Sequence, residues 1–288
     1  MSEVRGARRR RVAFQGERGA FSEEAALQLL GEDIETVPGA TFEALFSSLR
    51  DGAADYALAP FENSLAGSVH KCYDLLLESN LQIVAETILP ISHHLIGVSN
   101  AEFEQIVSVE SHPVALAQCE IFFRAHPRIR QRPALDTAGS VREVIRSGDR
   151  TRAAIAGKRA AEIYGGKILR EHLEDHRENY TRFLLLAAEP ESNPGADKLS
   201  LVVHLEHRPG ALRRVLDVFA ARHINLLKIE SRPIAGHPWE YRFYLDLQAS
   251  TNDPEAVRAL EELRGRTTAL RILGCYRAHR TWRSRGPS

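Results

Sequence analysis

The 288-residue chain has few of the features that mark specialised protein classes. Its three cysteines, Cys72, Cys119 and Cys275, lie far apart, so neither a zinc knuckle nor a disulfide framework is expected, and buried reduced thiols are the default. Neither charge is in excess, because 38 basic residues balance 38 acidic ones. Nucleic acid and anionic membranes favour basic surfaces, so we expect a small molecule or a protein as the partner. The reduced cysteines fit the cytoplasm as the compartment.

Long apolar runs and common catalytic signatures are also missing. The basic residues 5–11 lead into a short apolar stretch, residues 12–14, which is too short for a signal-peptide core or a membrane helix. We interpret this segment and the basic residues 277–288 as solvated tails. There is no Gly-x-Ser-x-Gly elbow, no metalloprotease helix motif and no phosphate-binding Lys loop, which argues against common hydrolase and nucleotide chemistries.

With 43% hydrophobic residues, the chain can bury two cores, and its pattern predicts two domains. Residues 11–187 alternate short apolar runs with helical patterns, the rhythm of an α/β domain with a largely parallel sheet. Thr41 is expected to cap a helix, and residues 112–127 are expected to form another, with Pro113 in its first turn. Residues 81–98 are apolar and β-branched with one Pro, so we expect two extended segments there.

A linker and a second module follow. Residues 187–198, AAEPESNPGADK, have linker composition. Residues 198–278 then read strand, helix, strand, strand, helix, strand, the βαββαβ order of a ferredoxin-like module. A sheet of this small size often uses a second copy to cover its surface or edge, so self-association is plausible.

Polar residues concentrate where strands of the first domain should end or helices begin. In open α/β sheets ligands bind beyond the carboxyl ends of strands, so these segments can converge on one site. Each has a plain alternative, since turns and helix caps have the same composition; Gly16 and Gly19 suit an anion or a simple turn, and Asp136 and Thr137 suit a carboxylate site or ordinary capping. The segments are GERGAFS (16–22), ENSLAGS (62–68), ISHHL (91–95), DTAGS (136–140) and NYTRF (179–183).

Two of these segments constrain the chemistry further. The adjacent His93 and His94 cannot point to the same face of a strand, so a shared metal site is not expected; one can line a cleft while the other packs or faces solvent. Glu62, Asn63 and Ser64 place a carboxylate, an amide and a hydroxyl in one loop, which can position a polar substrate, although loops commonly have this composition.

Taken together, the segments GERGAFSEEAA, APFENSLAGSV, ISHHL, SHPVALAQCEIFF, DTAGS and NYTRF stand in the order found in prephenate dehydratases. Residues 11–187 resemble the catalytic domain of that family, with Asn-x-Thr-Arg-Phe as the most specific motif. RPGALRRVL and IESRP resemble the ACT regulatory domain that follows it. The resemblance implies a catalytic domain of two α/β lobes, similar to type II periplasmic binding proteins, with the site in the cleft. It implies no cofactor and no metal.

The implied reaction is loss of carbon dioxide and the ring hydroxyl from prephenate, giving phenylpyruvate for L-phenylalanine biosynthesis. Thr181 matches the family's essential threonine, and we expect it to act by hydrogen bonding and proton relay, because an unperturbed hydroxyl is a weak acid. The resemblance implies catalytic roles for Thr181, Asn63, Ser64 and Glu62, substrate binding by Thr137, Ala138, Gly139, Arg182, Phe183 and His93, and effector binding by Gly210, Ala211, Leu212, Glu230, Ser231, Arg232 and Pro233.

Several alternatives stay open at this stage. Arogenate, the amino analogue of prephenate, is the second candidate substrate, and a cytoplasmic amino-acid sensor is the non-enzyme alternative. L-Phenylalanine is expected as the effector and a homodimer or homotetramer as the assembly. Relatives usually read His-Pro-Gln where this chain has His112, Pro113 and Val114, so affinity or substrate choice can differ. No helical region precedes residue 11, so we expect no fused chorismate mutase domain.

Overall fold

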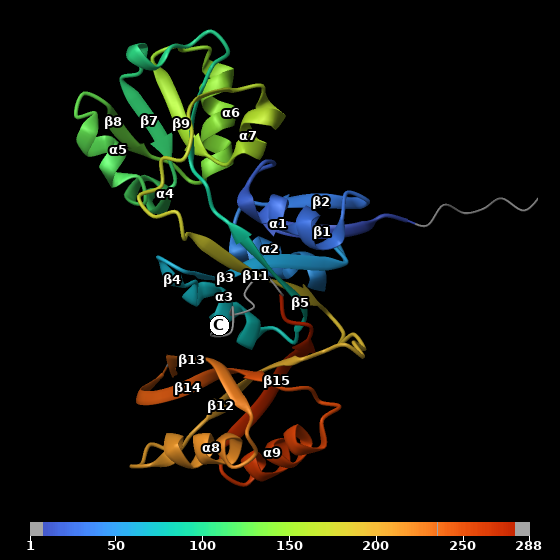
Figure 1. Cartoon of the computed structure of the whole chain (residues 1–288). Coiled ribbons are helices and arrows are strands. Elements are labelled where there is room, and N and C mark those ends of the chain that lie inside the picture. The colour runs from blue at the N-terminus through green and yellow to red at the C-terminus, as the bar shows by residue number, and fades with distance from the viewer. Residues whose placement is uncertain (1–7, 235, 280–288) are drawn as a thin grey trace, which may run out of the picture. The chain divides into compact units, whose positions relative to one another are not determined.

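The computed structural model describes residues 8–234 and 236–279, so residues 5–7 and 280–288 of the two basic segments lie outside the described residues. Arg10 and Arg11 were predicted to belong to a solvated tail, but they begin β1. The chain forms two compact units (Figure 1). The first comprises residues 1–80 and 87–185, and the second comprises residues 81–86 and 186–288. Among the described residues, no helix has the length and apolar character needed to cross a membrane.

A six-stranded sheet forms the first lobe of the first unit, in the order β2-β1-β3-β11-β5 with β4 paired to β3. Strand β1 runs parallel to both β2 and β3, so their carboxyl ends meet at one edge, as expected for an α/β domain. The strands are β1 (Arg10–Gln15), β2 (Ile34–Gly39), β3 (Tyr56–Asn63), β4 (Gly67–Ser68), β5 (Gln82–Pro90) and β11 (Tyr180–Ala187), and the helices are α1 (Phe21–Leu30), α2 (Phe42–Arg50) and α3 (His70–Glu78).

The second lobe is built on a five-stranded sheet in the order β10-β6-β9-β7-β8. Strand β7 runs parallel to β8 and β9, whereas β6 runs antiparallel to β9, so the expectation of a largely parallel sheet is only partly met. The strands are β6 (His94–Gly97), β7 (Ser108–Ser111), β8 (Arg130–Pro133), β9 (Arg152–Ala156) and β10 (Lys167–Arg170), and the helices are η1 (Phe103–Gln105), α4 (Pro113–Ala117), α5 (Glu120–Ala125), α6 (Thr137–Ser147) and α7 (Lys158–Tyr164).

The chain passes between the two lobes twice. Residues 81–98 form β5 and β6, the two extended segments predicted, and β11 later returns the chain to the first sheet between β3 and β5. Strand β6 follows β5 with no helix between them, and in the second sheet it pairs antiparallel with β9. Phe14 and Ala20 of the first lobe pack in one core with Ile96 and Ala138 of the second, which joins the lobes.

The predicted helix caps at Thr41 and Asp136 are confirmed, but the helix predicted over residues 112–127 is broken into two. Thr41 accepts a hydrogen bond from the Ala44 amide, and Asp136 caps α6. The segment expected to form one helix from residue 112 instead forms α4 and α5. The Asp175 carboxylate accepts hydrogen bonds from the Glu120 and Ile121 amides, both at 2.9 Å, and so caps a new helix at this point.

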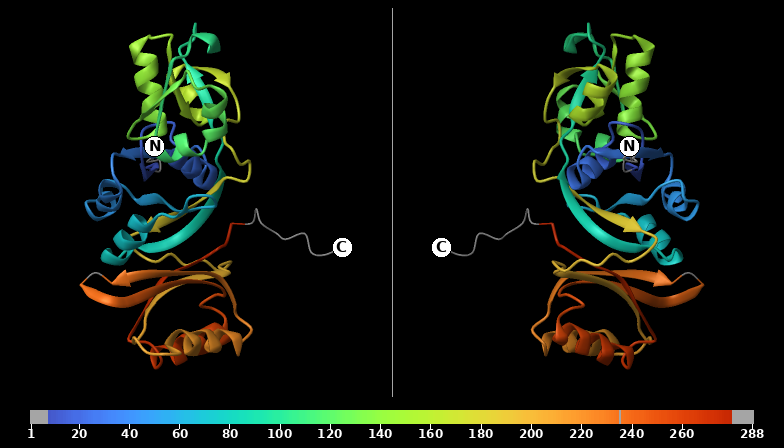
Figure 2. Two further views of the ribbon diagram at one scale, coloured as in Figure 1. Left: turned by 90° about the vertical axis from the view of Figure 1, so that its left-hand side faces the viewer. Right: turned by 90° about the vertical axis from the view of Figure 1, so that its right-hand side faces the viewer.

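The second unit contains the βαββαβ module predicted from the sequence. Its four antiparallel strands take the order β13-β14-β12-β15, with β13 at an edge. Figure 2 shows its two helices on one face of the sheet, where Leu201, Val215, Leu245 and Leu260 form the core. The elements are β12 (Lys198–His204), α8 (Ala211–Ala220), β13 (Asn225–Ile234), β14 (His237–Gln248), α9 (Pro254–Arg264) and β15 (Ala269–Tyr276).

A buried polar network lies on the opposite face of this sheet. Lys198 Nζ lies 3.1 and 2.9 Å from the two carboxylate oxygens of Glu86, and both side chains are buried. Ser200 Oγ donates to Asp246 Oδ1 at 2.5 Å and lies 2.7 Å from the Tyr276 hydroxyl. Glu86 is the last of the five residues of β5 that are part of the second unit, so this ion pair fixes the first half of β5 to β12.

All three cysteines are free, as expected, and Cys72 and Cys119 are buried while Cys275 is half-buried. Burial raises the pKa of the Cys72 and Cys119 thiols well above the ordinary value, so both stay protonated and unreactive.

We predict that Lys198→Met lowers the free energy of unfolding by about 3–5 kcal/mol, because the Glu86 carboxylate would stay buried without its cation. Urea unfolding monitored by circular dichroism measures this loss. Arg213→Ala is the matched control, since Arg213 pairs with Asp217 while 84% exposed and its loss should cost less than about 1 kcal/mol. Equal effects of the two substitutions would contradict a stabilising role for the buried pair.

Candidate active site

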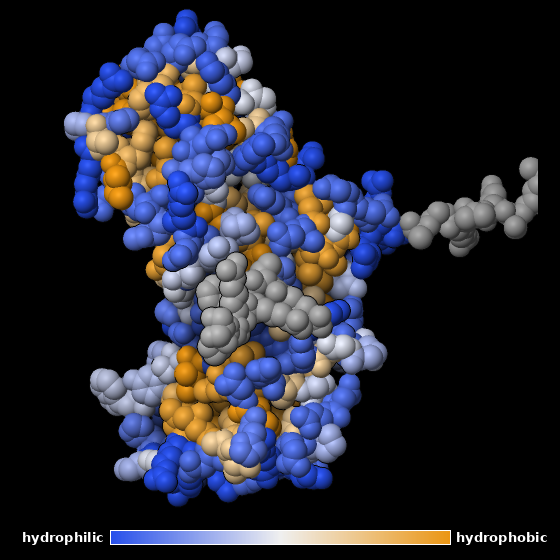
Figure 3. All heavy atoms as spheres, viewed as in Figure 1, coloured by the Kyte–Doolittle hydropathy of each residue, from blue (hydrophilic) through white to orange (hydrophobic). Residues whose placement is uncertain are grey.

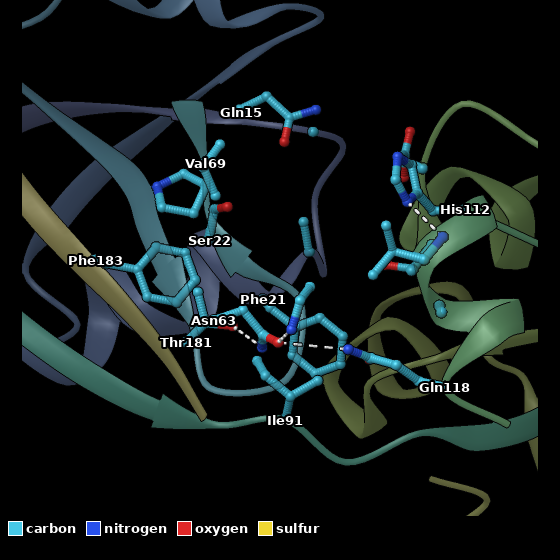
Figure 4. A pocket seen from close by; sticks show the side chains of 18 of the residues that line it. Gln15, Phe21, Ser22, Asn63, Val69, Ile91, His112, Gln118, Thr181 and Phe183 are labelled. Carbon is cyan, nitrogen blue, oxygen red and sulfur yellow. Dashed lines mark hydrogen bonds between the residues drawn. The ribbon is translucent and has the colours of Figure 1, made fainter. Parts of the chain in front are cut away.

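A cavity of about 440 Å³ in the first unit is lined by residues from all five predicted polar segments. Residues from the first lobe face residues from the second across it: Figure 4 shows Asn63, Thr181 and Phe183 on one side and His112 and Gln118 on the other. The lining residues are Gln15, Gly16, Ala20, Phe21, Ser22, Phe42, Pro60, Asn63, Ala66, Gly67, Ser68, Val69, Ile91, His93, His112, Val114, Ala115, Gln118, Leu135, Asp136, Thr137, Thr181 and Phe183.

Asn63 and Thr181 form the centre of the first-lobe wall. Asn63 Oδ1 accepts hydrogen bonds from the Leu65 and Ala66 amides at 3.0 and 2.8 Å, which fixes the orientation of the side-chain amide. Asn63 Nδ2 then lies 2.7 Å from Asn179 Oδ1, 3.1 Å from the Tyr180 carbonyl oxygen and 3.0 Å from Thr181 Oγ1, so its two hydrogens are shared among these three acceptors. Among the described residues no acceptor for the Thr181 hydroxyl hydrogen is found. The hydroxyl is therefore polarised by a donor and keeps its own hydrogen for a ligand.

Gln118, at the break between α4 and α5, connects this pair to His93. Its Oε1 accepts from Asn179 Nδ2 at 3.0 Å and lies 3.0 Å from His93 Nε2. Since Gln118 Oε1 is an acceptor, the network assigns the ring hydrogen of a neutral His93 to Nε2. Sequence analysis missed Gln118, because a glutamine inside a predicted helix carries no signal until the helix is seen to break beside it.

His93 and His94 point to different surroundings, as the alternation of strand side chains predicts. His93 lines the cavity, is 2% exposed and packs edge-on against Phe21. Burial lowers its pKa, with the Gln118 hydrogen bond acting in the opposite direction, so the ring is neutral at neutral pH. His94 is buried beside the ring of His172 and does not line the cavity.

Glu62, Ser64 and Arg182 support the site without lining the cavity. Ser64 Oγ donates to the Glu178 carbonyl and accepts from the Tyr180 amide, both at 2.9 Å, which ties the start of β11 to the loop after β3. Arg182 is 8% exposed and pairs with Glu62 at 3.8 Å. Arg182 was expected to bind substrate, but it does not line the cavity, and its pairing with Glu62 fits a role in bracing the loop.

Of the α6 residues predicted to bind substrate, one lines the cavity and two do not. Thr137 lines the cavity, but Ala138 and Gly139 are buried in the helix. The Gly139 amide donates to Asp136 Oδ1 at 2.6 Å, so it is already occupied by the cap. Sequence reasoning offered capping as one explanation of this segment, and the structure shows that Asp136 does cap the helix.

The glycines of the 16–22 segment form a joint between the lobes. The Gly19 amide donates to the buried Glu23 carboxylate at 2.7 Å, and Arg159 of the second lobe lies 3.4 Å from the same oxygen. Gly19 has φ +86°, and a Cβ there would come within 2.8 Å of Ala160 Cα. This amide is therefore not available for an anion, and the segment follows the alternative of a turn.

Helix termini supply the positive potential of the cavity. Among the described lining residues there is no Lys or Arg, whereas the N-terminal ends of α1, α3 and α6 contribute Ser22, Val69 and Thr137. The partial positive charge of helix N-termini favours carboxylates. Within the part of the chain that the structure describes, no cluster of three or more His, Cys, Asp or Glu side chains could hold a metal ion.

The residues predicted to bind an effector do not all share one cavity. Ala211 and Leu212 line a cavity of about 140 Å³ in the second unit, together with residues 205–208, Tyr241 and Phe243. Gly210 precedes α8 with φ 77°, in the left-handed region that glycine tolerates. Glu230, Ser231, Arg232 and Pro233 lie on the edge strand β13 and do not line that cavity.

Comparison with known proteins places this arrangement in a family. The prephenate dehydratase model matches residues 12–191 and the ACT domain model matches residues 199–265. The chain is 44% identical over 283 residues to arogenate dehydratase/prephenate dehydratase 1, chloroplastic, of Arabidopsis thaliana, covering 92% of this chain and 71% of the relative.

Two solved structures agree with this assignment of the fold. Prephenate dehydratase from Arthrobacter aurescens in complex with L-Phe has a TM-score of 0.85 and 32% identity, and the match covers 93% of this chain and 90% of that chain. GqqA, described as a novel type of quorum quenching acylase, has a TM-score of 0.87 and 32% identity, covering 95% of this chain and 100% of that chain. The chain belongs to the prephenate dehydratase family and carries the family's dehydratase domain followed by an ACT domain.

Proposed function

We propose that the protein converts prephenate to phenylpyruvate in the cavity of the first unit. The observation that carries this proposal is the Thr181 hydroxyl, which accepts a hydrogen bond from Asn63 and keeps its hydrogen for a ligand. The reaction breaks the bond between the ring and the departing carboxylate, and the released electron pair moves through the ring to expel the hydroxyl opposite. One proton is taken up, and carbon dioxide and water leave.

The chain's own groups meet the two demands of this step. Hydroxide is a poor leaving group, so Thr181 donates its hydrogen to the departing oxygen while Asn63 stabilises the developing charge on Thr181 Oγ1. The carboxylate that becomes carbon dioxide must not be over-stabilised. Helix N-termini and apolar side chains such as Phe21 and Phe183 line the cavity. These groups bind a carboxylate less tightly than a bidentate salt bridge with an arginine would.

We further propose the domain boundaries, the cellular compartment and the oligomeric state. The catalytic domain comprises residues 11–187 and the regulatory domain residues 198–278, and the enzyme works in the cytoplasm. The apolar side chains Leu227, Ile229, Trp239 and Tyr241 are exposed on β13 and β14, and Figure 3 shows hydrophobic surface over this part of the second unit. An edge strand with exposed apolar side chains supports pairing of copies as a homodimer or homotetramer.

We predict that Thr181→Val reduces turnover of prephenate by on the order of a hundredfold or more, because it removes the hydrogen given to the leaving oxygen. Valine keeps the branched shape, so the circular dichroism spectrum should not change. Phenylpyruvate formation measures the effect, and Thr181→Ser should retain part of the activity. Near-normal turnover by folded Thr181→Val would remove the proposed role.

A second prediction concerns Val114, which lines the cavity and is 44% exposed. Val114→Gln is expected to strengthen prephenate binding by about 1 kcal/mol, because the amide gains a polar contact that valine cannot make. The Michaelis constant for prephenate gives the measurement, with Val114→Leu as an apolar control. An unchanged Michaelis constant in both variants would make Val114 a packing residue.

We also predict that L-phenylalanine binds the second unit and lowers activity. Ala211→Asp should abolish this inhibition, because a carboxylate in the small cavity repels that of the ligand, while an acidic residue suits the first turn of α8. Calorimetry and the fractional inhibition of each protein, relative to its own turnover without phenylalanine, test this. Equal inhibition of both proteins would place the effector elsewhere.

A further inference from the structure

Asp136 is the single carboxylate among the described residues that line the catalytic cavity, and no described Lys or Arg accompanies it there. Prephenate carries two carboxylates and a ketone. Arogenate carries the same two carboxylates, but an ammonium group replaces the ketone. A cavity wall with one negative side chain and no cationic one therefore matches the charges of arogenate better than those of prephenate.

The position of Asp136 agrees with the geometry of the reaction. Asp136 precedes α6 of the second lobe, whereas Thr181 lies on β11 and Asn63 on β3 of the first lobe. Figure 4 shows the second-lobe residue His112 across the cavity from Asn63 and Thr181, while Gln118 reaches Asn63 at 3.5 Å. In either substrate, the leaving hydroxyl and the amino- or keto-bearing side chain are attached at opposite ends of the ring. With the hydroxyl at Thr181, the side chain points toward the second lobe.

One oxygen of Asp136 is available to a ligand. Asp136 Oδ1 accepts the Gly139 amide at 2.6 Å, and the Asp136 carbonyl accepts from Ser140 Oγ at 2.7 Å. No donor to Asp136 Oδ2 is found among the described residues. Gly139 makes room for this carboxylate, because a Cβ at that position would lie 2.8 Å from Oδ2.

Nearby titratable side chains do not cancel this charge. His112 lines the same cavity, and its Nδ1 accepts from the Val114 amide at 3.2 Å. Burial lowers the pKa of His112, and the opposing effect of Asp136 is smaller, so the ring is neutral at neutral pH. Arg142 of α6 lies 2.7 Å from Glu17 and does not line the cavity.

We propose that Asp136 is a specificity-determining residue that binds the α-ammonium of arogenate and so allows this cavity to use arogenate as well as prephenate. The inference rests on the proposed dehydratase function of the same cavity. A charge-assisted hydrogen bond from the ammonium to Oδ2 favours arogenate, and the same carboxylate disfavours the ketone of prephenate, which offers only an acceptor.

Asp136→Asn tests the proposal, because asparagine caps a helix as well as aspartate and keeps Oδ1 as the acceptor for Gly139. Phenylalanine formed from arogenate and phenylpyruvate formed from prephenate are measured for the full-length wild type and the variant. For arogenate, kcat/KM should fall on the order of tenfold or more, mainly through KM. For prephenate it should rise, because the carboxylate that disfavours the ketone is removed.

In Asp136→Ser, serine also caps the helix, so kcat/KM for each substrate should change in the same direction as in Asp136→Asn. This second variant guards against poor folding of the first. Asp253→Asn, the same change at the cap of α9, should leave their ratio unchanged. An equal loss with both substrates in the Asp136 variants, or unchanged efficiency with arogenate, would overturn the proposal and leave Asp136 as a cap. If the wild type turns over neither substrate, the proposed dehydratase function itself fails.

Discussion

The hydrogen bond between Asn63 and Thr181 is the contact on which the proposed catalytic site depends. It joins residues that lie 118 positions apart in the chain, and it exists because β11 returns to the first sheet beside β3. Ser64 closes the same junction through the backbone of Glu178 and Tyr180. The chain therefore leaves the first lobe after β3 and β5, forms the second lobe, and returns beside β3, where the Thr181 hydroxyl lies next to the Asn63 amide.

The charge pattern of the cavity follows from how the two lobes are assembled. Their helices begin at the cavity, so the backbone supplies positive potential that the described side chains there do not. The Glu23 and Arg159 pair and the shared core around Phe14 hold the lobes together on one side, which keeps these helix ends directed at one space. Asp136 is the one carboxylate among the described side chains that line this cavity, which is why we propose it as the residue that discriminates between substrates.

Two strands connect the catalytic groups to the second unit by chain continuity. The first five residues of β5, residues 82–86, belong to the second unit, and the chain continues from β5 to Ile91 and His93, which line the cavity. Strand β11 carries Thr181 and ends in the second unit. The buried pair between Glu86 and Lys198 anchors the first half of β5.

The sequence by itself determined the element types, the order of the βαββαβ module and the five segments that line the cavity. These features depend on local periodicity and on caps such as Thr41, which act over three or four residues. Only the tertiary structure decided that Arg182 braces a loop and that the Gly19 and Gly139 amides are already occupied. It also broke the helix after α4 and so brought Gln118 to His93 and to Asn179, which is 61 residues away. Asp175 caused that break from 55 positions away, and no local pattern carries information over such a distance.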